Sequence, residues 1–450
     1  MVNTALQVFE YGCVAIGTDK LLPKGIAAIP SAAYHYLKQI CLNETVNTQF
    51  LRLRNLGGVE VLQLQNYAGV ILTPDGTQIE VLPKVTKHAH HENGVAQSRA
   101  ALLNMLRELG SFRHIQTNAA SVKHQKMPLL EVFIGQFLSS VNQLIKKGLK
   151  SEYCQRRDNL LYLKGKLQVS EQLKRNSVSQ HKFAVEYDEF LPNTLPNQLV
   201  KTALSKVLTL TRSGAHQKLA RELLFAFEGV AFIERLTSDT ENIHVSRGMD
   251  YYQSPIAWSN LILKGRSPLT MSGNSKAFSL LFPLESVFES YVASILAKLT
   301  PNNIKLSSQA KSQHLVTYNT RGMFKLKPDL MLSSNNQALV VLDTKWKLID
   351  LAKNNGTDKY QLSQADFYQM FAYGQKYLSG RGELILIYPA SEKFDQPIPF
   401  SFEFSDELLL WVVPFDIQHD TLDENRIVFP NETVLEGLLN SSICGAISNE

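Results

Sequence analysis

Hydrophobic and polar residues alternate along much of the first 90 residues. The segment 50–65, FLRLRNLGGVEVLQLQ, alternates on both sides of its Gly-Gly pair, and the segment 67–85 alternates on both sides of a Pro-Asp-Gly sequence. Alternation around such turn residues is typical of β-hairpins, because strand side chains point to opposite faces in turn. The pattern predicts a β-rich N-terminal domain over residues 1–90, a small barrel or sandwich, with a polar linker at 86–94.

From about residue 96 the apolar residues recur every three or four positions, which is the period of an amphipathic α-helix. The segment 129–145 carries such a stripe, and a second covers 199–208, shortly after Pro196. Proline is tolerated at the start of a helix, so it supports this boundary. A third helix is predicted through 217–236. We therefore expect a mainly helical middle domain over residues 91–270.

The C-terminal part mixes both patterns. The predicted helices and strands are helices at 283–299 and 363–378, and strands near 322–332, 338–346, 382–389 and 407–416. The strand GELILIYP at 382–389 is apolar throughout, which is typical of a strand buried on both faces. The predicted fold class is multidomain α+β, with a C-terminal α/β domain over residues 271–450.

The composition narrows the classes of protein that remain possible. The chain has 450 residues, of which 44% are apolar and 19% charged, so two to four folded domains are expected rather than a disordered chain. The four cysteines are scattered without CxxC spacing, which argues against a disulfide framework or a zinc knuckle. Neither a signal peptide nor an apolar run of about 18 residues is found, so we expect a cytoplasmic protein without membrane association.

A strongly basic window runs from Lys146 to Lys182. It contains ten Lys or Arg and three acidic residues, although the net charge of the whole chain is only +5. The window is either a solvated helix surface or a contact for a phosphate backbone or an acidic partner. The candidate contact residues are Lys146, Lys147, Arg156, Arg157, Lys164, Lys166, Lys174 and Arg175.

Candidate chemistry appears in the stretch FKLKPDLMLSSNNQALVVLDTKWK, residues 324–347. In a strand over 338–346, Asp343 and Lys345 share one face at the end of an apolar run. Asp329 follows Pro328 in the preceding strand segment, and a short polar loop can bring its carboxylate to the same point. Two carboxylates suit Mg²⁺, and a nearby lysine can orient water or offset charge on a phosphate. Because Asp-x-Lys is common by chance, an ordinary hairpin with charged ends remains the alternative.

Two helices carry polar residues that could join this site. On the helix at 363–378, Gln369 and Tyr373 share a face with Asp366, which suits either contact with phosphate or water or an aromatic packing face with a polar edge. Glu289, on the helix at 283–299, is either a third carboxylate of the site or a surface acid.

Together these segments resemble a known family. KPDLML followed by VLDTKWK is similar to the PD-(D/E)xK nuclease motif. FPLESVFESYV and SQADFYQMFAYGQKY resemble the flanking segments of McrC, the endonuclease subunit of McrBC-type modification-dependent (type IV) restriction systems. YLKGKLQVSEQLKRN (162–176), YDEFLPNTLPNQLVKTAL (187–204) and NYAGVILTPDGTQIEVLPKV (66–85) resemble further McrC segments. The segments occur in the family's order over most of the chain, which is more specific than the Asp-x-Lys alone.

The resemblance implies a C-terminal PD-(D/E)xK nuclease domain that cuts double-stranded, modified DNA with Mg²⁺. Asp329, Asp343 and Lys345 match the nuclease triad, Asp329 and Asp343 as the metal ligands, whereas Glu289 and Gln369 match supporting positions. It also implies a partner, a McrB-like AAA+ GTPase hexamer, which the N-terminal domain would engage and stimulate. The basic window would contact DNA or this ring, or bring a cation to a neighbour's nucleotide as an arginine finger does.

The sequence agrees with the need for a partner. It has no GxxxxGK[ST] loop, so we expect no nucleotide to bind to this chain. Two other functions stay open: a non-catalytic adaptor that activates an AAA+ NTPase on a retained nuclease fold, and a stand-alone nuclease.

Overall fold

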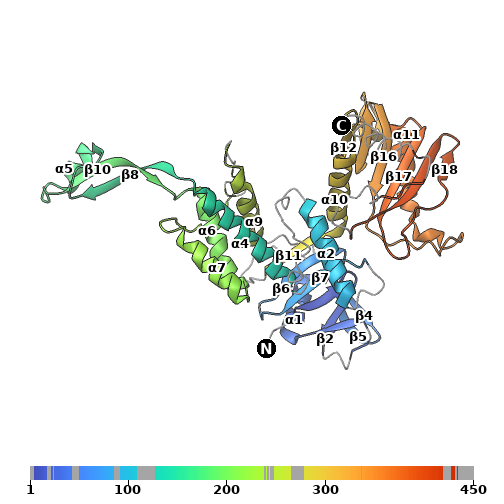
Figure 1. Cartoon of the computed structure of the whole chain (residues 1–450), viewed down its shortest axis with the longest axis horizontal. Helices are drawn as coiled ribbons and strands as arrows, with labels where there is room; N and C mark the ends of the chain where they lie inside the picture. Colours follow the sequence, from blue (N-terminus) through green and yellow to red (C-terminus); the bar gives the residue numbers. More distant parts are fainter. Residues whose placement is uncertain are drawn as a thin grey trace, which may run out of the picture. The chain divides into compact units, whose positions relative to one another are not determined.

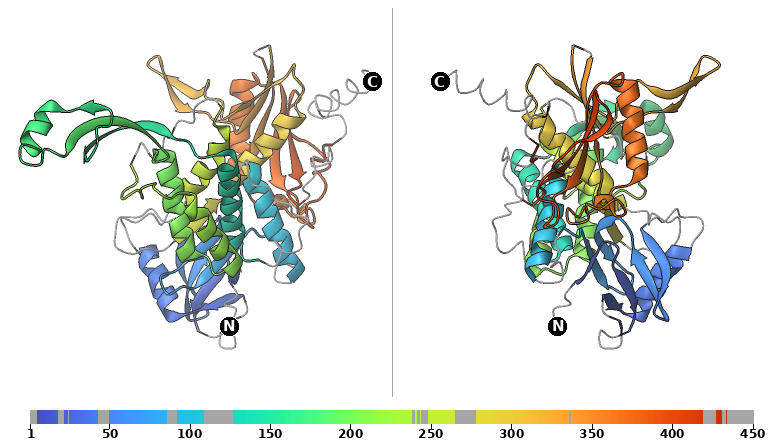
Figure 2. Two further views of the ribbon diagram at one scale, coloured as in Figure 1. Left: turned by 60° about the vertical axis from the view of Figure 1, so that its left-hand side comes forward. Right: turned by 90° about the vertical axis from the view of Figure 1, so that its right-hand side faces the viewer.

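The fold is described from a computed structural model of the whole chain (Figures 1 and 2). The described residues are 5–17, 22–23, 25–42, 50–85, 92–108, 127–237, 240, 243, 248–264, 278–335, 337–418, 427–430 and 433. They belong to two compact units. Unit 1 comprises Met1–Leu129 and Arg266–Glu450, and unit 2 comprises Leu130–Gly265. Most of the predicted linker at 86–94 lies outside the described residues.

The N-terminal part of unit 1 contains two four-stranded sheets. One has the order β1 (Leu6–Phe9), β7 (Gln78–Leu82), β6 (Tyr67–Leu72), β11 (Phe278–Pro283). The other has the order β3 (Ile26–Ile29), β2 (Cys13–Ile16), β5 (Val59–Leu64), β4 (Leu51–Leu56), and helix α1 (Ser31–Leu42) shares an apolar core with both sheets. The two predicted hairpins are confirmed as the antiparallel pairs β4–β5 and β6–β7.

Strand β11 comes from far along the chain, yet it pairs with β6. The two strands approach each other at Gly69, whose φ is 141°. A Cβ atom at this position would lie 1.9 Å from the carbonyl oxygen of Leu280. Only glycine therefore allows β11 to complete this sheet. Helix α2 (Glu92–Glu108) also belongs to unit 1, where Arg99 and Glu80 of β7 form a buried ion pair.

The C-terminal part of unit 1 is built on a six-stranded sheet. Its order is β12 (Lys305–Ser308), β15 (Leu330–Ser334), β16 (Gln337–Thr344), β17 (Gly382–Pro389), β19 (Leu408–Phe415), β18 (Phe402–Ser405). The three central strands β16, β17 and β19 run parallel. Seven of the eight residues of β17 are buried, which confirms the prediction from its continuous apolar run.

Helices α10 (Leu284–Leu299) and α11 (Gln364–Tyr377) cover opposite faces of this sheet (Figure 2). Val341 of β16 packs in the core with Met370 and Tyr373 of α11, whereas Trp346 contacts Phe288 of α10. Odd-numbered residues at the end of β16 therefore face α11 and even-numbered residues face α10, as strand alternation predicts. A short 3₁₀ turn, η2 (Lys359–Gln361), precedes α11.

Two boundaries differ from the predictions. The strand expected near 322–332 is wrong: residues 321–325 form β14 (Arg321–Lys325), which pairs with β13 (His314–Tyr318) in a separate hairpin, and only β15 joins the main sheet. The helix expected through 217–236 ends early, because α7 (Gly214–Phe225) is followed by turns.

Unit 2 combines helices with a long hairpin. The helices are α4 (Leu129–Lys147), which begins in unit 1, α6 (Leu195–Leu210), α7, α9 (Gln253–Lys264) and the short η1 (Asp250–Tyr252). The helices predicted at 129–145 and 199–208 are confirmed as α4 and α6. No helix among the described residues is long and apolar enough to cross a membrane.

The basic window is only partly a helix surface, because its central part, between the end of α4 and α5 (Val169–Arg175), belongs to a hairpin. Strands β8 (Glu152–Leu160) and β10 (Phe183–Leu191) pair antiparallel along nine residues, with β9 (Lys166–Leu167) and α5 between them in sequence. Figure 1 shows this hairpin, here called the arm (residues 151–191), extending from the helices of unit 2 with α5 at its far end. All nine residues of β8 are at least partly exposed.

A buried carboxylate organises the helices of unit 2. Glu131 in the first turn of α4 is 6% exposed, and it accepts hydrogen bonds from the Thr211 hydroxyl and from the backbone N–H of Arg212. His216 of α7 lies 2.7 Å from the same carboxylate. Burial raises the pKa of Glu131, but the bonds from His216, Thr211 and Arg212 outweigh burial and hold it below its usual value. The ionised carboxylate thus links α4 to the segment that starts α7.

We expect Glu131→Ala to lower the free energy of unfolding of unit 2 by about 3 kcal/mol, because buried donors lose their acceptor. Calorimetry of the full chain at pH 7 measures this effect, with Glu222→Ala on the exposed side of α7 as the control. Since the pKa of Glu131 is lowered, its contribution is present above about pH 4.5 and disappears as the pH falls. Equal unfolding temperatures for the two variants would contradict this role.

Candidate active site

Asp343 and Lys345 lie together at the C-terminal end of β16. Asp343 is 1% exposed, and its Oδ2 atom lies 2.6 Å from Nζ of Lys345. Neither carboxylate oxygen of Asp343 has a regular hydrogen bond. The ion pair with Lys345 is therefore the main interaction that offsets the cost of burying this charge. The structure thus places the predicted Asp-x-Lys pair on one face of the strand.

Asp329 reaches the same place from the neighbouring strand. It stands immediately before β15, whose Leu330 pairs with Leu342 of β16. Its Oδ2 atom accepts hydrogen bonds from the backbone N–H and from the hydroxyl of Thr344, both 2.8 Å long. Because Thr344 lies between the other two residues in sequence, these bonds fix Asp329 beside the Asp343–Lys345 pair. The antiparallel register therefore brings all three predicted triad residues together.

Helix α11 holds Lys345 through a chain of hydrogen bonds. Nζ of Lys345 donates to Oε1 of Gln369 (3.1 Å), and Nε2 of Gln369 donates to the hydroxyl of Tyr373 (2.7 Å). That hydroxyl donates to the carbonyl oxygen of Lys327 (2.9 Å), two residues before Asp329. Tyr373 is only 3% exposed. Its position is therefore that of a residue that orients Gln369, and contact of Tyr373 with DNA or a partner stays a prediction.

The acidic residues of the site repel one another. Burial, followed by the charge of Asp329, raises the pKa of Asp343 to about 7, although Lys345 acts in the opposite direction. Burial and the charge of Asp329 also raise the pKa of Glu289, whose Oε1 accepts a bond from Gln309. Burial lowers the pKa of Lys345, but the neighbouring Asp343 outweighs burial and raises it, so this ammonium remains charged.

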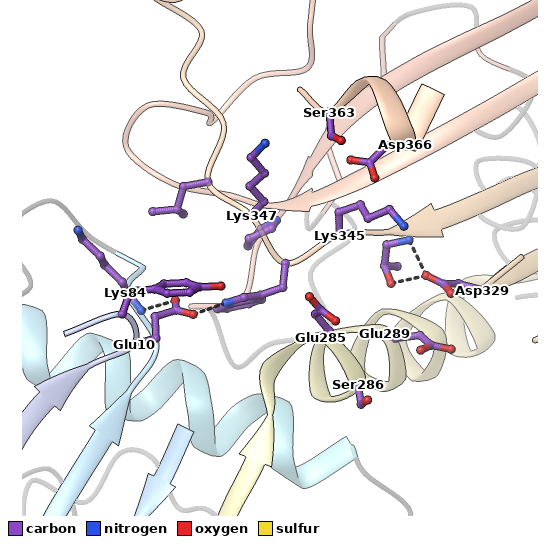
Figure 3. A pocket seen from close by; sticks show the side chains of 15 residues that line it. Glu10, Lys84, Glu285, Ser286, Glu289, Asp329, Lys345, Lys347, Ser363 and Asp366 are labelled. Atoms are coloured by element: carbon purple, nitrogen blue, oxygen red, sulfur yellow. Dashed lines mark hydrogen bonds between the residues drawn. The ribbon is translucent and has the colours of Figure 1, made fainter. Parts of the chain in front are cut away.

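The site opens into a cavity of about 870 Å³ within unit 1 (Figure 3). Figure 3 shows Asp329, Lys345 and Asp366 on one side of it, and Glu285 and Glu289 on α10. Asp343 is not among the lining residues, and its side chain is buried. Glu289 thus belongs to the wall of the cavity rather than to a remote surface.

Sequence reasoning missed several lining residues, namely Glu10, Tyr11, Lys84, Glu285 and Lys347. Asp366, which shares a helix face with Gln369 in the sequence, does line the cavity. Glu10, Tyr11 and Lys84 had no usable signal, because only tertiary structure brings the N-terminal sheet to this cavity.

The donor set fits a hard divalent cation. The described residues contain no group of three or more His, Cys, Asp or Glu side chains already arranged as metal ligands. However, the Oδ1 atom of Asp343 is buried without a hydrogen-bond partner. The negative charge of Asp329 repels the Asp343 carboxylate and raises its pKa. A cation would relieve this repulsion, and carboxylate oxygens are the ligands that Mg²⁺ prefers. Asp329 and Asp343 are thus suitable ligands.

The candidate residues of the basic window all lie in unit 2, in different elements. Lys146 and Lys147 end α4, Arg156 and Arg157 lie on β8, Lys164 precedes β9, Lys166 lies on β9, and Lys174 and Arg175 end α5. Several are paired with acids: Arg157 with Glu186, Arg156 and Lys164 with Glu189, and Arg175 with Glu171. Strand β10 adds three acidic residues. Residues 146–191 therefore contain ten Lys or Arg and six Asp or Glu, so the positive charge is less concentrated than in the window alone.

One hydrogen bond connects the candidate site to the N-terminal sheet. Glu10, which follows β1, is 5% exposed and accepts bonds from the Trp346 indole (2.8 Å) and from the backbone N–H of Lys84 (2.9 Å). Trp346 is adjacent to Lys345 in sequence. The indole of Trp346 is buried against Phe288, so this contact anchors the chain directly after the Asp-x-Lys pair.

A family model described as McrBC 5-methylcytosine restriction system component matches residues 62–389. The fold is similar to a chain in the refined half-complex from the tetradecameric assembly of Thermococcus gammatolerans McrB AAA+ hexamers with bound McrC. This match covers 98% of this chain and 100% of the other, with a TM-score of 0.66 and 18% identity.

A second match is to a chain in the cryo-EM structure of the Thermococcus gammatolerans McrBC complex. It covers 70% of this chain and 92% of the other, with 22% identity, and its TM-score of 0.47 is too low to support an argument. No curated protein sequence matches the chain.

The Glu10–Trp346 contact predicts a pH-dependent stability. Burial raises the pKa of Glu10 from 4.5 to about 7, although the bonds from Lys84 and Trp346 act in the opposite direction. An acid whose folded-state pKa is raised favours folding while it is protonated, so stability should fall as the pH rises from about 4.5 to 7. We expect Glu10→Gln to flatten this fall by about 2–3 kcal/mol.

Urea unfolding at pH 5, 6, 7 and 8 gives the free energy of unfolding of the wild type and of Glu10→Gln. The difference between the two proteins isolates Glu10, because the other titrating groups contribute equally to both. Parallel curves of stability against pH would contradict the raised pKa of Glu10.

Proposed function

Because the chain belongs to the family of McrBC 5-methylcytosine restriction system components and is a McrC-like member of it, we propose that it is the DNA-cutting subunit of a McrBC-type complex. It hydrolyses phosphodiester bonds of double-stranded DNA with Mg²⁺. It does so when activated by a McrB-like AAA+ GTPase, and it stimulates nucleotide hydrolysis by that partner.

The single observation that carries this proposal is the grouping of Asp329, Asp343 and Lys345 at the end of β16. A buried carboxylate without a hydrogen-bond partner, paired with a lysine and beside a second acid, is costly for folding alone. Strained electrostatics of this kind, next to a large cavity, are typical of functional sites. This arrangement supports a PD-(D/E)xK nuclease domain in the C-terminal part of unit 1.

The residues divide the work by their chemistry. Asp329 and Asp343 would hold the Mg²⁺ ion, which when bound polarises a phosphoryl oxygen and makes a bound water more acidic. In the reaction, the oxygen of a water attacks phosphorus, one P–O ester bond breaks, and the leaving oxygen takes a proton. The charged ammonium of Lys345 positions the attacking water and offsets the negative charge that develops on the phosphate.

Other residues act through these three. Gln369 holds Nζ of Lys345, and Tyr373 holds Gln369, so both are positioning residues. Thr344 fixes one oxygen of Asp329. Glu289 lines the cavity and contributes a further negative charge that can attract the cation.

The partner is proposed from the family and from the absence of a phosphate-binding loop. The solved structure with a similar fold contains McrB AAA+ hexamers with bound McrC. This chain has no GxxxxGK[ST] motif, so the energy for moving DNA would come from another chain. We assign ring contact to the arm, because its far end exposes Leu161, Tyr162 and Leu163 by 60–68%. Engagement of the partner by the N-terminal sheets stays a prediction.

We expect Asp343→Asn and Lys345→Ala each to lower the rate of DNA cleavage by at least about 100-fold in the presence of Mg²⁺ and the cognate AAA+ partner. The matched controls are Asp406→Asn, in an exposed turn, and Lys376→Ala, on the exposed side of α11, and both should cut normally. Plasmid cleavage measured over time, with and without EDTA, provides the test.

The same variants separate the nuclease from a non-catalytic adaptor. A nuclease subunit with Asp343→Asn should still stimulate GTP hydrolysis by the partner while it no longer cuts DNA. If Asp343→Asn cuts DNA as fast as the Asp406→Asn control, Asp343 has no role in the reaction. If the wild type stimulates its partner but never cuts, the adaptor function is the correct one.

A further inference from the structure

The β13–β14 hairpin precedes the candidate site and has no role in the function proposed above. Its strands are joined by a two-residue turn at Asn319 and Thr320, both with positive φ. This is the type I′ geometry that suits tight hairpins. All five residues of β14 are exposed, as are four of the five residues of β13. The hairpin therefore has almost no core of its own.

The charge of this hairpin is entirely of one sign. Residues 310–328 contain four Lys or Arg and no Asp or Glu. The four cations are Lys311, Arg321, Lys325 and Lys327. Within the part of the chain that the structure describes, no ion pair or hydrogen bond engages their side chains. In contrast, four of the seven Lys and Arg side chains of the arm are paired with acids.

Exposed aromatic side chains lie among these cations. Tyr318 is 69% exposed and pairs across the strands with Arg321, and Phe324 is 72% exposed beside Lys325. Phe324 also has a φ of 56°, a strained value for a bulky residue. Unpaired cations with interleaved aromatic rings are typical of a nucleic-acid surface, because cations contact phosphates and rings pack against sugars and bases.

The base of the hairpin is fixed to the helix that organises the site. The hydroxyl of Tyr377 on α11 lies 3.1 Å from the carbonyl oxygens of both Ala310 and Leu326, one on each side of the hairpin. The hydroxyl of Tyr373 on the same helix donates to the carbonyl of Lys327. Lys325 lies four residues before Asp329, a distance of at most about 14 Å along an extended chain. The hairpin is thus held close to the proposed cleavage point.

We propose that the β13–β14 hairpin is a DNA-binding element that grips the duplex next to the cleavage site. Arg321, Lys325 and Lys327 contact phosphates near the one that is cut, and Tyr318 contacts the sugar or base edge. This inference rests on the proposed function for the identity of the substrate. The hairpin residues are separate from the proposed catalytic residues, because none of the hairpin side chains contacts the phosphate that reacts.

DNA binding without cleavage tests the hairpin directly. The full-length chain is titrated with a fluorescein-labelled 30-base-pair duplex in EDTA, from 50 to 200 mM KCl, by fluorescence anisotropy. We expect Arg321→Gln combined with Lys325→Gln to raise Kd about 5- to 20-fold. The slope of log Kd against log salt should fall by about two, one for each lost phosphate contact. Tyr318→Ala should raise Kd without changing the slope.

The matched control is Lys218→Gln combined with Arg221→Gln, which removes the same charge from exposed positions of α7 and should leave Kd within about twofold. A Kd and slope equal to those of the wild type, or no binding by the wild type itself, would overturn the proposal. So would a variant that keeps its DNA affinity but no longer cuts with the AAA+ partner, because the hairpin would then contact protein.

These outcomes are separate from the failure of the proposed function. The binding assay needs no cleavage, so its result does not depend on which residues carry out the reaction. If the hairpin variants lose DNA affinity while Asp343→Asn still cuts, the hairpin is right and the catalytic assignment is wrong.

Discussion

The buried ion pair between Asp343 and Lys345 is the interaction on which the candidate site depends. A carboxylate at the end of a parallel strand between two helices has little access to water, so its charge needs a partner. Lys345 supplies this partner from the same face of the same strand, and Gln369 and Tyr373 of α11 then hold Lys345 in place. The position of Lys345, and with it the geometry of the site, therefore depends on the packing of α11 against the sheet.

Two connections extend this arrangement through unit 1. The hydrogen bond from Trp346 to Glu10 joins the end of β16 to the N-terminal sheet. The cavity is therefore lined both by residues next to this sheet and by residues of the C-terminal part of unit 1. Tyr377 and Tyr373 join α11 to the β13–β14 hairpin. Helix α11 therefore contacts both the residues proposed for cleavage and the element proposed for DNA binding.

Some of this structure was predictable from sequence, and the reasons are local. Strand alternation placed Asp343 with Lys345, and continuous apolar sequence marked β17, because both signals depend only on neighbouring residues. Other features had no local signal: the strand β8 is exposed throughout, so it lacks the apolar period that would reveal it, and it forms by pairing with β10. The role of Glu10 was also invisible, since Trp346 lies 336 positions away in sequence.

The proposed activity requires that Asp329 and Asp343 hold a divalent cation beside Lys345. Titration of the full-length chain with Mn²⁺, followed by electron paramagnetic resonance, tests it most directly, because bound and free Mn²⁺ give different signals. The account predicts saturable binding that Mg²⁺ competes away, that Asp343→Asn abolishes, and that Asp406→Asn leaves unchanged. Binding of the same strength in wild type and Asp343→Asn, or none in either, would contradict it.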